Sequence, residues 1–193
     1  MTQKLNTFAQ VRELKGWRAV AFSATLLERM LPNYLLFCEA SEFEDPSQYR
    51  KTLDLIWEYL SAPKSKINFA VHLERIEEST PDAANFDMYG VYPAIDTAMS
   101  LTATLYLIQG DDPQGAVVVS KLSQGSVEAF VEATADEVLD NQQIKQHPLM
   151  QWEIAFQAEL LETLQQQKAS PELFKQLKAM AREEGMSNIG IEF

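Results

Sequence analysis

The sequence is poor in cysteine, histidine and glycine, and each shortage excludes a class of chemistry. Its 193 residues include one cysteine, Cys38, so no disulfide can form within the chain. Together with the two histidines, His72 and His147, this is too little for a tetrahedral zinc site. The seven glycines stand singly, and no Gly-rich phosphate loop, Walker-type lysine motif or nucleophile elbow is present. The sequence therefore predicts no metal and no cofactor, and it identifies no reaction.

Basic residues and long apolar runs are also scarce. Asp and Glu number 28 against 16 Lys and Arg, so the net charge of −12 repels nucleic-acid phosphates and anionic lipids. The most apolar stretch, Thr97 to Ile108, is shorter than the ~20 residues that a membrane span needs. Residues 1–8 contain no continuous apolar segment of the kind that secretory signals carry. We therefore expect a cytoplasmic protein that binds neither nucleic acid nor membrane directly.

Proline follows a good helix-capping residue at four places in the chain. The pairs are Asp45-Pro46, Thr80-Pro81, Asp112-Pro113 and Ser170-Pro171. In each pair a side-chain oxygen can accept from a free backbone N–H, while proline occupies the first helical position without loss. We predict that these pairs start helices, with only a short turn between Thr80 and Phe86.

Apolar residues recur with the 3.6-residue period of a helix along most of the chain. Such stripes begin at Trp17, Leu53, Phe69, Leu149 and Leu173. Residues from Pro93 to Gln109 are apolar around the whole helical circumference, which is typical of the most buried helix. The valine-rich run from Ala116 to Val119 lies in a further expected helix, from Pro113 to about Ala133. We predict a single all-α domain over residues 1–193, an irregular bundle of about eight helices around the Pro93 to Gln109 helix.

Two local predictions accompany this fold. Cys38 follows the apolar residues 35–37 and has no cationic neighbour, so we expect a buried, slowly reacting thiol. The C-terminal residues 189–193 are apolar where chain ends are usually polar, so we expect them to dock on the bundle.

Carboxylates recur on several expected helices and could line the bundle interior, as they do in di-iron proteins. They are Glu28, Asp54, Glu58, Glu74, Glu77 and Asp96. Di-iron sites in bundles need Glu-x-x-His pairs, and neither His72 nor His147 has a Glu three residues before it. We therefore expect these carboxylates to lie on solvent-exposed helix faces or to form ion pairs within their own helices.

The segment from Phe86 to Asp96 is the best candidate for a polar site. Asp87, Tyr89, Tyr92 and Asp96 surround a glycine-containing turn, and His72 is a further candidate. In the functional hypothesis an aspartate acts as acid or base and the tyrosines donate hydrogen bonds. In the structural alternative, which we favour, the segment is a helix entry with buried tyrosine rings. If Pro93 is the first helical position, Asp96 lies in the opening turn, where its negative charge interacts favourably with the positive end of the helix dipole. Asp96→Asn should then destabilise the fold.

Four strings give the chain a family resemblance. They are residues 28–34 (ERMLPNY), 53–58 (LDLIWE), 86–96 (FDMYGVYPAID) and 187–191 (SNIGI). Together they resemble the YjaG-like family of uncharacterised bacterial proteins over essentially the whole chain. The resemblance implies a small all-helical bacterial protein, and it supplies no reaction, cofactor or catalytic residue.

Three hypotheses for function follow. The leading one is a non-catalytic helical module that acts through protein partners, including a second copy of itself as a homodimer. It is motivated by the missing catalytic motifs and by large apolar residues such as Trp17, Trp57 and Trp152 in an acidic shell. The alternatives are an enzyme or small-ligand binder that uses the Asp87 to Asp96 segment, and an acidic mimic that binds a basic protein.

Overall fold

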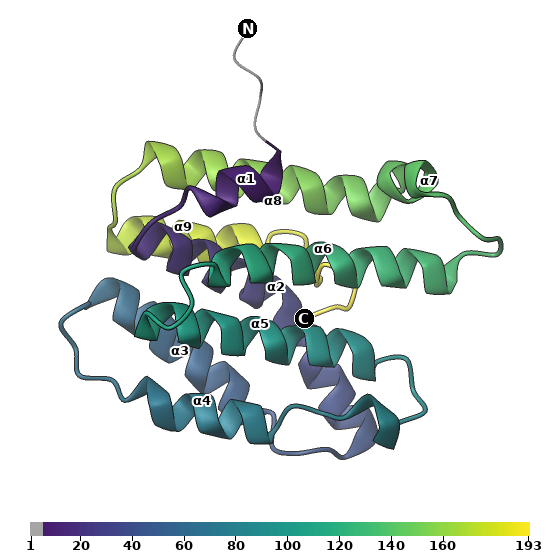
Figure 1. The fold of residues 1–193 in the computed structure, drawn as a ribbon, viewed down its shortest axis with the longest axis horizontal. Helices are drawn as coiled ribbons and strands as arrows, with labels where there is room; N and C mark the ends of the chain where they lie inside the picture. The colour runs from purple at the N-terminus through teal and green to yellow at the C-terminus, as the bar shows by residue number, and fades with distance from the viewer. Residues whose placement is uncertain (1–5) are drawn as a thin grey trace, which may run out of the picture.

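The computed structural model describes residues 6–193, and the prediction of an all-α bundle is confirmed (Figure 1). The helices within this range are α1 Thr7–Arg12, α2 Trp17–Ser41, α3 Ser47–Ser61, α4 Phe69–Glu78, α5 Val91–Gln109, α6 Gly115–Thr134, α7 Asn141–Gln146, α8 Pro148–Gln166 and α9 Pro171–Arg182. A 3₁₀ turn, Ala83–Asn85, and an isolated β-bridge between Met186 and Glu192 complete the secondary structure of this range. Residues 1–5, which belong to the segment examined above for a secretory signal, lie outside the described residues.

Of the four predicted capping pairs, Ser170-Pro171 starts a helix as expected, whereas the other three lie shortly before a helix or turn without capping it. Ser170 Oγ accepts from the Leu173 N–H, and Pro171 is the first residue of α9. Asp45 and Asp112 accept from backbone N–H groups two residues later, just before α3 and α6. Thr80 precedes only the 3₁₀ turn, which Asp82 caps. The valine-rich run lies inside α6, so the weak strand pattern there gives way to helix.

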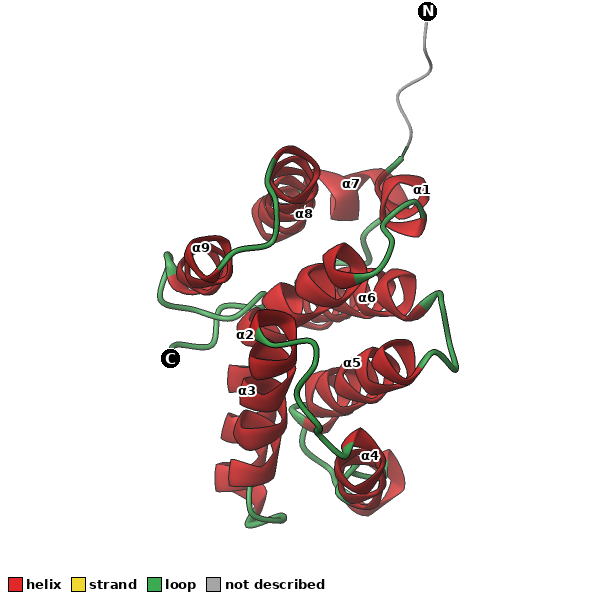
Figure 2. Ribbon diagram, turned by 90° about the vertical axis from the view of Figure 1, so that its left-hand side faces the viewer, coloured by secondary structure: helices red, strands yellow, loops and turns green. Residues whose placement is uncertain are grey.

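The centre of the bundle is α2, whereas the sequence predicted the Pro93 to Gln109 helix. Eighteen of the 25 residues of α2 are buried, against 10 of the 19 in α5. In Figure 1, α2 crosses behind α5 and α6, and it packs against α3, α8 and α9 as well. Figure 2 shows α4, α5 and α6 stacked one above another, with α8 and α9 beyond α2. The prediction was wrong because α5, although apolar on all sides, is not buried on all sides: Tyr92 and Met99 are exposed on its outer side.

Close packing of α5 on α6 depends on one glycine. A Cβ atom built on Gly115 would lie 2.6 Å from the Ala103 carbonyl oxygen and 2.8 Å from Leu107 Cβ. Real Cβ atoms do not approach backbone this closely, so the first turn of α6 can reach α5 only without a side chain here.

The predicted burial of Cys38 is confirmed, whereas the predicted docking of residues 189–193 is confirmed only in part, since Ile189 is buried but Phe193 is 56% exposed. Cys38 is buried, and burial raises the pKa of its thiol. Near the C-terminus Ser187, Asn188 and Ile189 are buried, and the Asn188 N–H donates to the Arg29 carbonyl at 3.3 Å. Among residues 6–193, no helix combines the length and apolar character needed to cross a membrane.

Candidate functional site

The structure brings together three of the five residues predicted for a polar site. Asp96 accepts from Ser126 Oγ of α6 at 2.6 Å. The rings of Tyr89 and Tyr92 lie 5.9 Å apart, and Tyr89 also lies 6.3 Å from Phe130 of α6. Burial of the hydroxyl raises the pKa of Tyr89, and the charges of Asp96 and Glu132 add to the shift. These contacts connect the start of α5 with the second half of α6.

The other two predicted residues are arranged differently. His72, on α4, pairs through Nδ1 with Gln48 Nε2 of α3 at 3.2 Å. Burial lowers the pKa of its imidazole, and the nearby Arg75 charge lowers it further. Asp87 is exposed in the turn before α5. His72 therefore serves the α3–α4 contact in this arrangement, apart from the α5–α6 contacts of Asp96.

The expected position of Asp96 in the opening turn of α5 is wrong. The helix begins at Val91, two residues before Pro93, and its first turn holds no acidic residue. Asp96 therefore lies in the second turn, where its carboxylate bonds to Ser126 across the helix pair instead of to free N–H groups. Burial raises the pKa of this carboxyl, and the Ser126 hydrogen bond offsets only part of the rise.

A buried polar network that the sequence analysis missed joins α2, α6, α8 and the C-terminal segment. Arg29 of α2 forms an ion pair with Glu153 of α8, and both side chains are almost completely buried. Glu153 also accepts from Ser123 of α6 and, at 2.8 Å, from Gln157 Nε2. Asn188 completes the network by donating to the Ser123 carbonyl oxygen at 3.2 Å. Polar atoms from four parts of the chain thus meet in the core.

Two aromatic rings of α8 enclose the Arg29 guanidinium. Its central carbon lies 4.0 Å from the ring centre of Phe156 and 4.4 Å from that of Trp152. Aromatic faces attract a cation, and this attraction grows where water is excluded. The Nη2 atom is buried without a hydrogen-bond partner among residues 6–193, so the rings are its main compensation. Because the group is shielded from solvent, we interpret the network as structural.

Glu28, the neighbour of Arg29, holds a second cluster. Arg50 donates to both of its oxygens, at 2.6 and 2.8 Å, and Arg182 of α9 donates at 3.0 Å. The Trp57 indole N–H donates at 2.8 Å. Burial acts to raise the pKa of Glu28, but these donors and the Arg50 charge outweigh it and hold the pKa below its ordinary value. Glu28 thus ties α2 to α3 and α9.

The carboxylates considered for a metal site are mostly engaged with protein partners. Asp54 pairs with Arg50 at 2.7 Å, Glu77 accepts from the Tyr106 hydroxyl at 2.7 Å, and Asp96 accepts from Ser126. Glu58 and Glu74 are exposed. Among the residues that the structure describes, no group of three or more His, Cys, Asp or Glu side chains could hold a metal ion.

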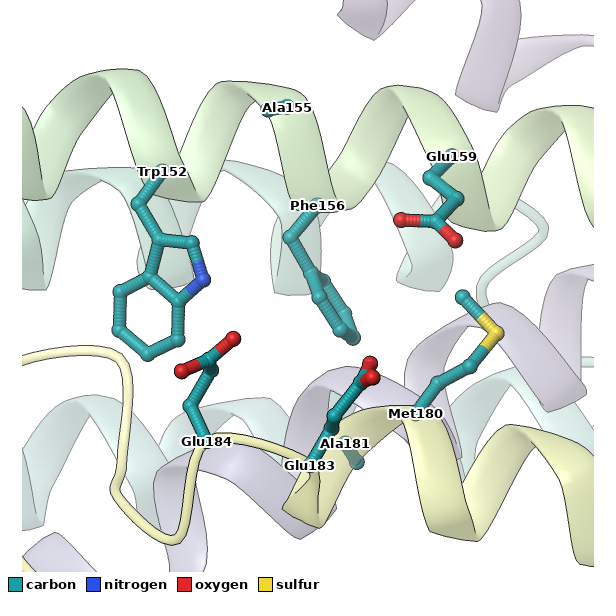
Figure 3. A pocket seen from close by; sticks show the side chains of 8 residues that line it. All are labelled: Trp152, Ala155, Phe156, Glu159, Met180, Ala181, Glu183 and Glu184. Carbon is teal, nitrogen blue, oxygen red and sulfur yellow. The ribbon is translucent and has the colours of Figure 1, made fainter.

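An acidic pocket of about 200 Å³ lies between α8 and α9 (Figure 3). Figure 3 shows Trp152 and Phe156 on one wall, with Glu184, Glu183 and Met180 facing them. Trp152 and Phe156 are the rings that enclose Arg29, so the pocket lies against the buried network.

Exposed apolar side chains gather at the start of α5. Of the eight large apolar residues exposed within residues 6–193, four lie between positions 88 and 99: Met88, Tyr89, Tyr92 and Met99. Tyr92 and Met99 are seven residues apart, which places them on one side of the helix, about 10 Å from each other. We call these four residues the Met88–Met99 face.

One sequence signal could have indicated the buried network. Glu28 and Arg29 interrupt the apolar stripe of α2, and Glu153 stands between Trp152 and Ile154. A charge inside an apolar stripe predicts a buried ion pair, because an unpaired buried charge is too costly to keep. The partners could not be identified this way, since Arg29 and Glu153 are 124 residues apart in sequence.

Comparison with known proteins gives a consistent result. A protein named "Uncharacterized protein YjaG" from Escherichia coli strain K12 is 40% identical over 186 residues, which cover 95% of each chain. An uncharacterized protein from Haemophilus influenzae is 35% identical over 187 residues, again with 95% of each chain covered. The crystal structure of a DUF416 family protein from Shewanella baltica superimposes with a TM-score of 0.91 and 38% identity, covering 98% of this chain and 100% of that one.

These similarities confirm the resemblance to the YjaG-like family that the four sequence strings indicated. The model of one family, described as a protein of unknown function (DUF416), matches residues 6–192. The chain belongs to the DUF416 family.

Proposed function

We propose that this protein is a non-catalytic helical module that binds another protein chain through the Met88–Met99 face. The proposal rests on one observation: half of the large apolar residues that are exposed within residues 6–193 lie in this short segment. Tyrosine and methionine are enriched in the buried centres of protein interfaces, and exposed apolar clusters of this kind often mark such interfaces. Covering apolar surface yields roughly 25 cal/mol per Å², which favours association.

The occupant that we propose is a second copy of the chain. Tyr92 and Met99 form a short stripe along one side of α5, with a spacing of seven residues. When two such helices pair antiparallel about a two-fold axis, Tyr92 of one lies opposite Met99 of the other, so the stripe is self-complementary. We further propose that the protein works in a reducing cytoplasm, since its only cysteine is buried and has no intrachain partner.

Sedimentation velocity over a range of protein concentrations tests the proposal. The parent protein should dimerise, and Met99→Glu should shift it to monomer because each interface would then bury two carboxylates near the axis. Val138→Glu is the matched control, since Val138 is fully exposed outside the Met88–Met99 face and should leave the dimer intact. A parent that is monomeric at every concentration, or a Met99→Glu variant that still dimerises, would refute the proposed interface.

A further inference from the structure

We infer that an apolar pocket at the start of α2 binds a small apolar molecule that carries one acidic group. The pocket encloses about 470 Å³, a size within the range of roughly 300 to 1,000 Å³ that is usual for small-molecule sites. It lies at the left-hand edge of the molecule in Figure 1, where the α1–α2 turn, the end of α3 and the α5–α6 turn meet. The Met88–Met99 face belongs to the first half of α5 and the turn before it and shares no residue with this pocket, so the inference is independent of the proposed dimer.

The walls of this pocket are mostly apolar. They come from Leu14, Trp17, Leu60, Leu107, Ile108 and Pro113, with the Tyr59 ring among them. Trp17 and Tyr59 are partly exposed, and the Trp17 ring is fixed by an edge contact with Phe174, with ring centres 6.0 Å apart. Because the Trp17 ring is held in this way, that side of the pocket is formed before a ligand binds.

The charges around this pocket indicate the chemistry of its ligand. The chain carries 28 acidic residues, yet among the described residues, 6–193, no acidic side chain lines the pocket, and Lys15 is the only charged residue that does. Among residues 6–193 no carboxylate forms an ion pair with Lys15, so its ammonium group is available to a ligand. The pocket between α8 and α9 has the opposite character, because its three charged residues are all glutamates.

The backbone adds to the positive potential near Lys15. Gly16, Trp17 and Ala19 of the pocket wall belong to the N-terminus of α2, which is 25 residues long. Gly16 precedes this helix, and no side chain caps the helix N-terminus. The free N–H groups and the positive end of the helix dipole favour an anion there. An apolar cavity with one cation beside a helix N-terminus therefore fits a carboxylic acid with a hydrocarbon or aromatic body.

Isothermal titration with decanoate tests this inference, with 1-decanol as a probe of the same chain length without the charge. We expect decanoate to bind and decanol to bind about tenfold more weakly. Lys15→Glu should weaken decanoate binding about tenfold, because it replaces an exposed attraction with an equal repulsion. Ile108→Trp, which adds a ring inside the pocket, should weaken both probes, with the melting temperature confirming that each variant is folded.

Lys51→Glu is the matched control for charge. Lys51 lies on α3 nine residues before Leu60, about 13 Å along the helix, where salt screens its effect on the pocket. This variant should leave the decanoate affinity within about twofold of the parent. The inference is overturned if the parent does not bind decanoate, if decanol binds as tightly, or if Lys15→Glu weakens binding no more than Lys51→Glu does.

Discussion

Replacing Glu153 by glutamine should destabilise the protein strongly, because it leaves the Arg29 charge buried and unpaired. The change keeps the shape of the side chain, and the new amide oxygen can still accept from Ser123 and Gln157. Both members of the pair are at most 1% exposed, so water cannot replace the lost carboxylate. Removing one partner of a buried pair costs about 3–5 kcal/mol, and the retained hydrogen bonds place the expected cost near 3 kcal/mol.

A urea melt followed by circular dichroism measures this cost. In a domain of this size, about 3 kcal/mol corresponds to a fall of roughly 6–12 °C in melting temperature. Asp54→Asn is the matched control, since it breaks an exposed pair with Arg50 and should cost less than about 1 kcal/mol. In the double variant Arg29→Met with Glu153→Gln, the loss should be smaller than the sum of the two single losses.

The reasoning fails if Glu153→Gln changes the free energy of unfolding by less than about 1 kcal/mol at an unchanged m-value. It also fails if the two single losses add in the double variant, because additivity would mean that the Arg29 and Glu153 charges do not interact.

Four further predictions follow from particular contacts. Cys38 should react slowly with a thiol reagent in the native protein and fully after denaturation, because burial raises its pKa; rapid native labelling would contradict this. Deleting the residues after Gly185 should lower the melting temperature, since they complete the Arg29 network, and an unchanged value would refute their docking. Asp96→Asn should raise the free energy of unfolding at pH 7, contrary to the expectation from sequence. Because the pKa of Asp96 is raised in the folded state, its protonated form stabilises the fold below the unfolded pKa of about 3.9. This stabilisation is lost as the pH rises through the folded-state pKa, so the variant should gain stability at pH 7. A melt at pH 7 that shows destabilisation of Asp96→Asn would contradict this. Gly115→Ala should cost about 1–3 kcal/mol in a urea melt, whereas Gly125→Ala, with open space around the new methyl, should stabilise α6 by about 0.5–1 kcal/mol; equal effects would refute the close approach.

Local patterns predicted the helices well because they depend on neighbouring residues. Ser170 caps α9 with its own hydroxyl, and the stripe that begins at Trp17 continues along α2. Helix existence therefore follows from spacing and capping, which are visible in the sequence. The burial of Cys38 followed in the same way from its apolar neighbours.

Which helix lies at the centre could not be predicted from such patterns. The sequence of α5 is more uniformly apolar than that of α2, which contains Glu28 and Arg29. Those two charges are buried only because Arg50, Arg182 and Glu153 reach them from three other helices. Pairing over such separations depends on tertiary packing, which a single sequence does not reveal. Asp96, Tyr89 and Tyr92 lie together because they are close in sequence, whereas His72 is distant in sequence and Asp87, although close, is exposed in the turn.

The docking of Asn188 has a consequence for how the protein is made. Chains are synthesised from the N-terminus, so the residues of α2 are made well before Glu153 and Asn188. Asn33 of α2 donates to Asn188 at 2.9 Å across 155 residues, and the Arg29 charge meets Glu153 across 124. Arg29 and Asn33 of α2 are therefore made long before the residues that become their polar partners. Until those later residues are made, the Arg29 charge and the Asn33 amide lack the partners that they have in the folded protein.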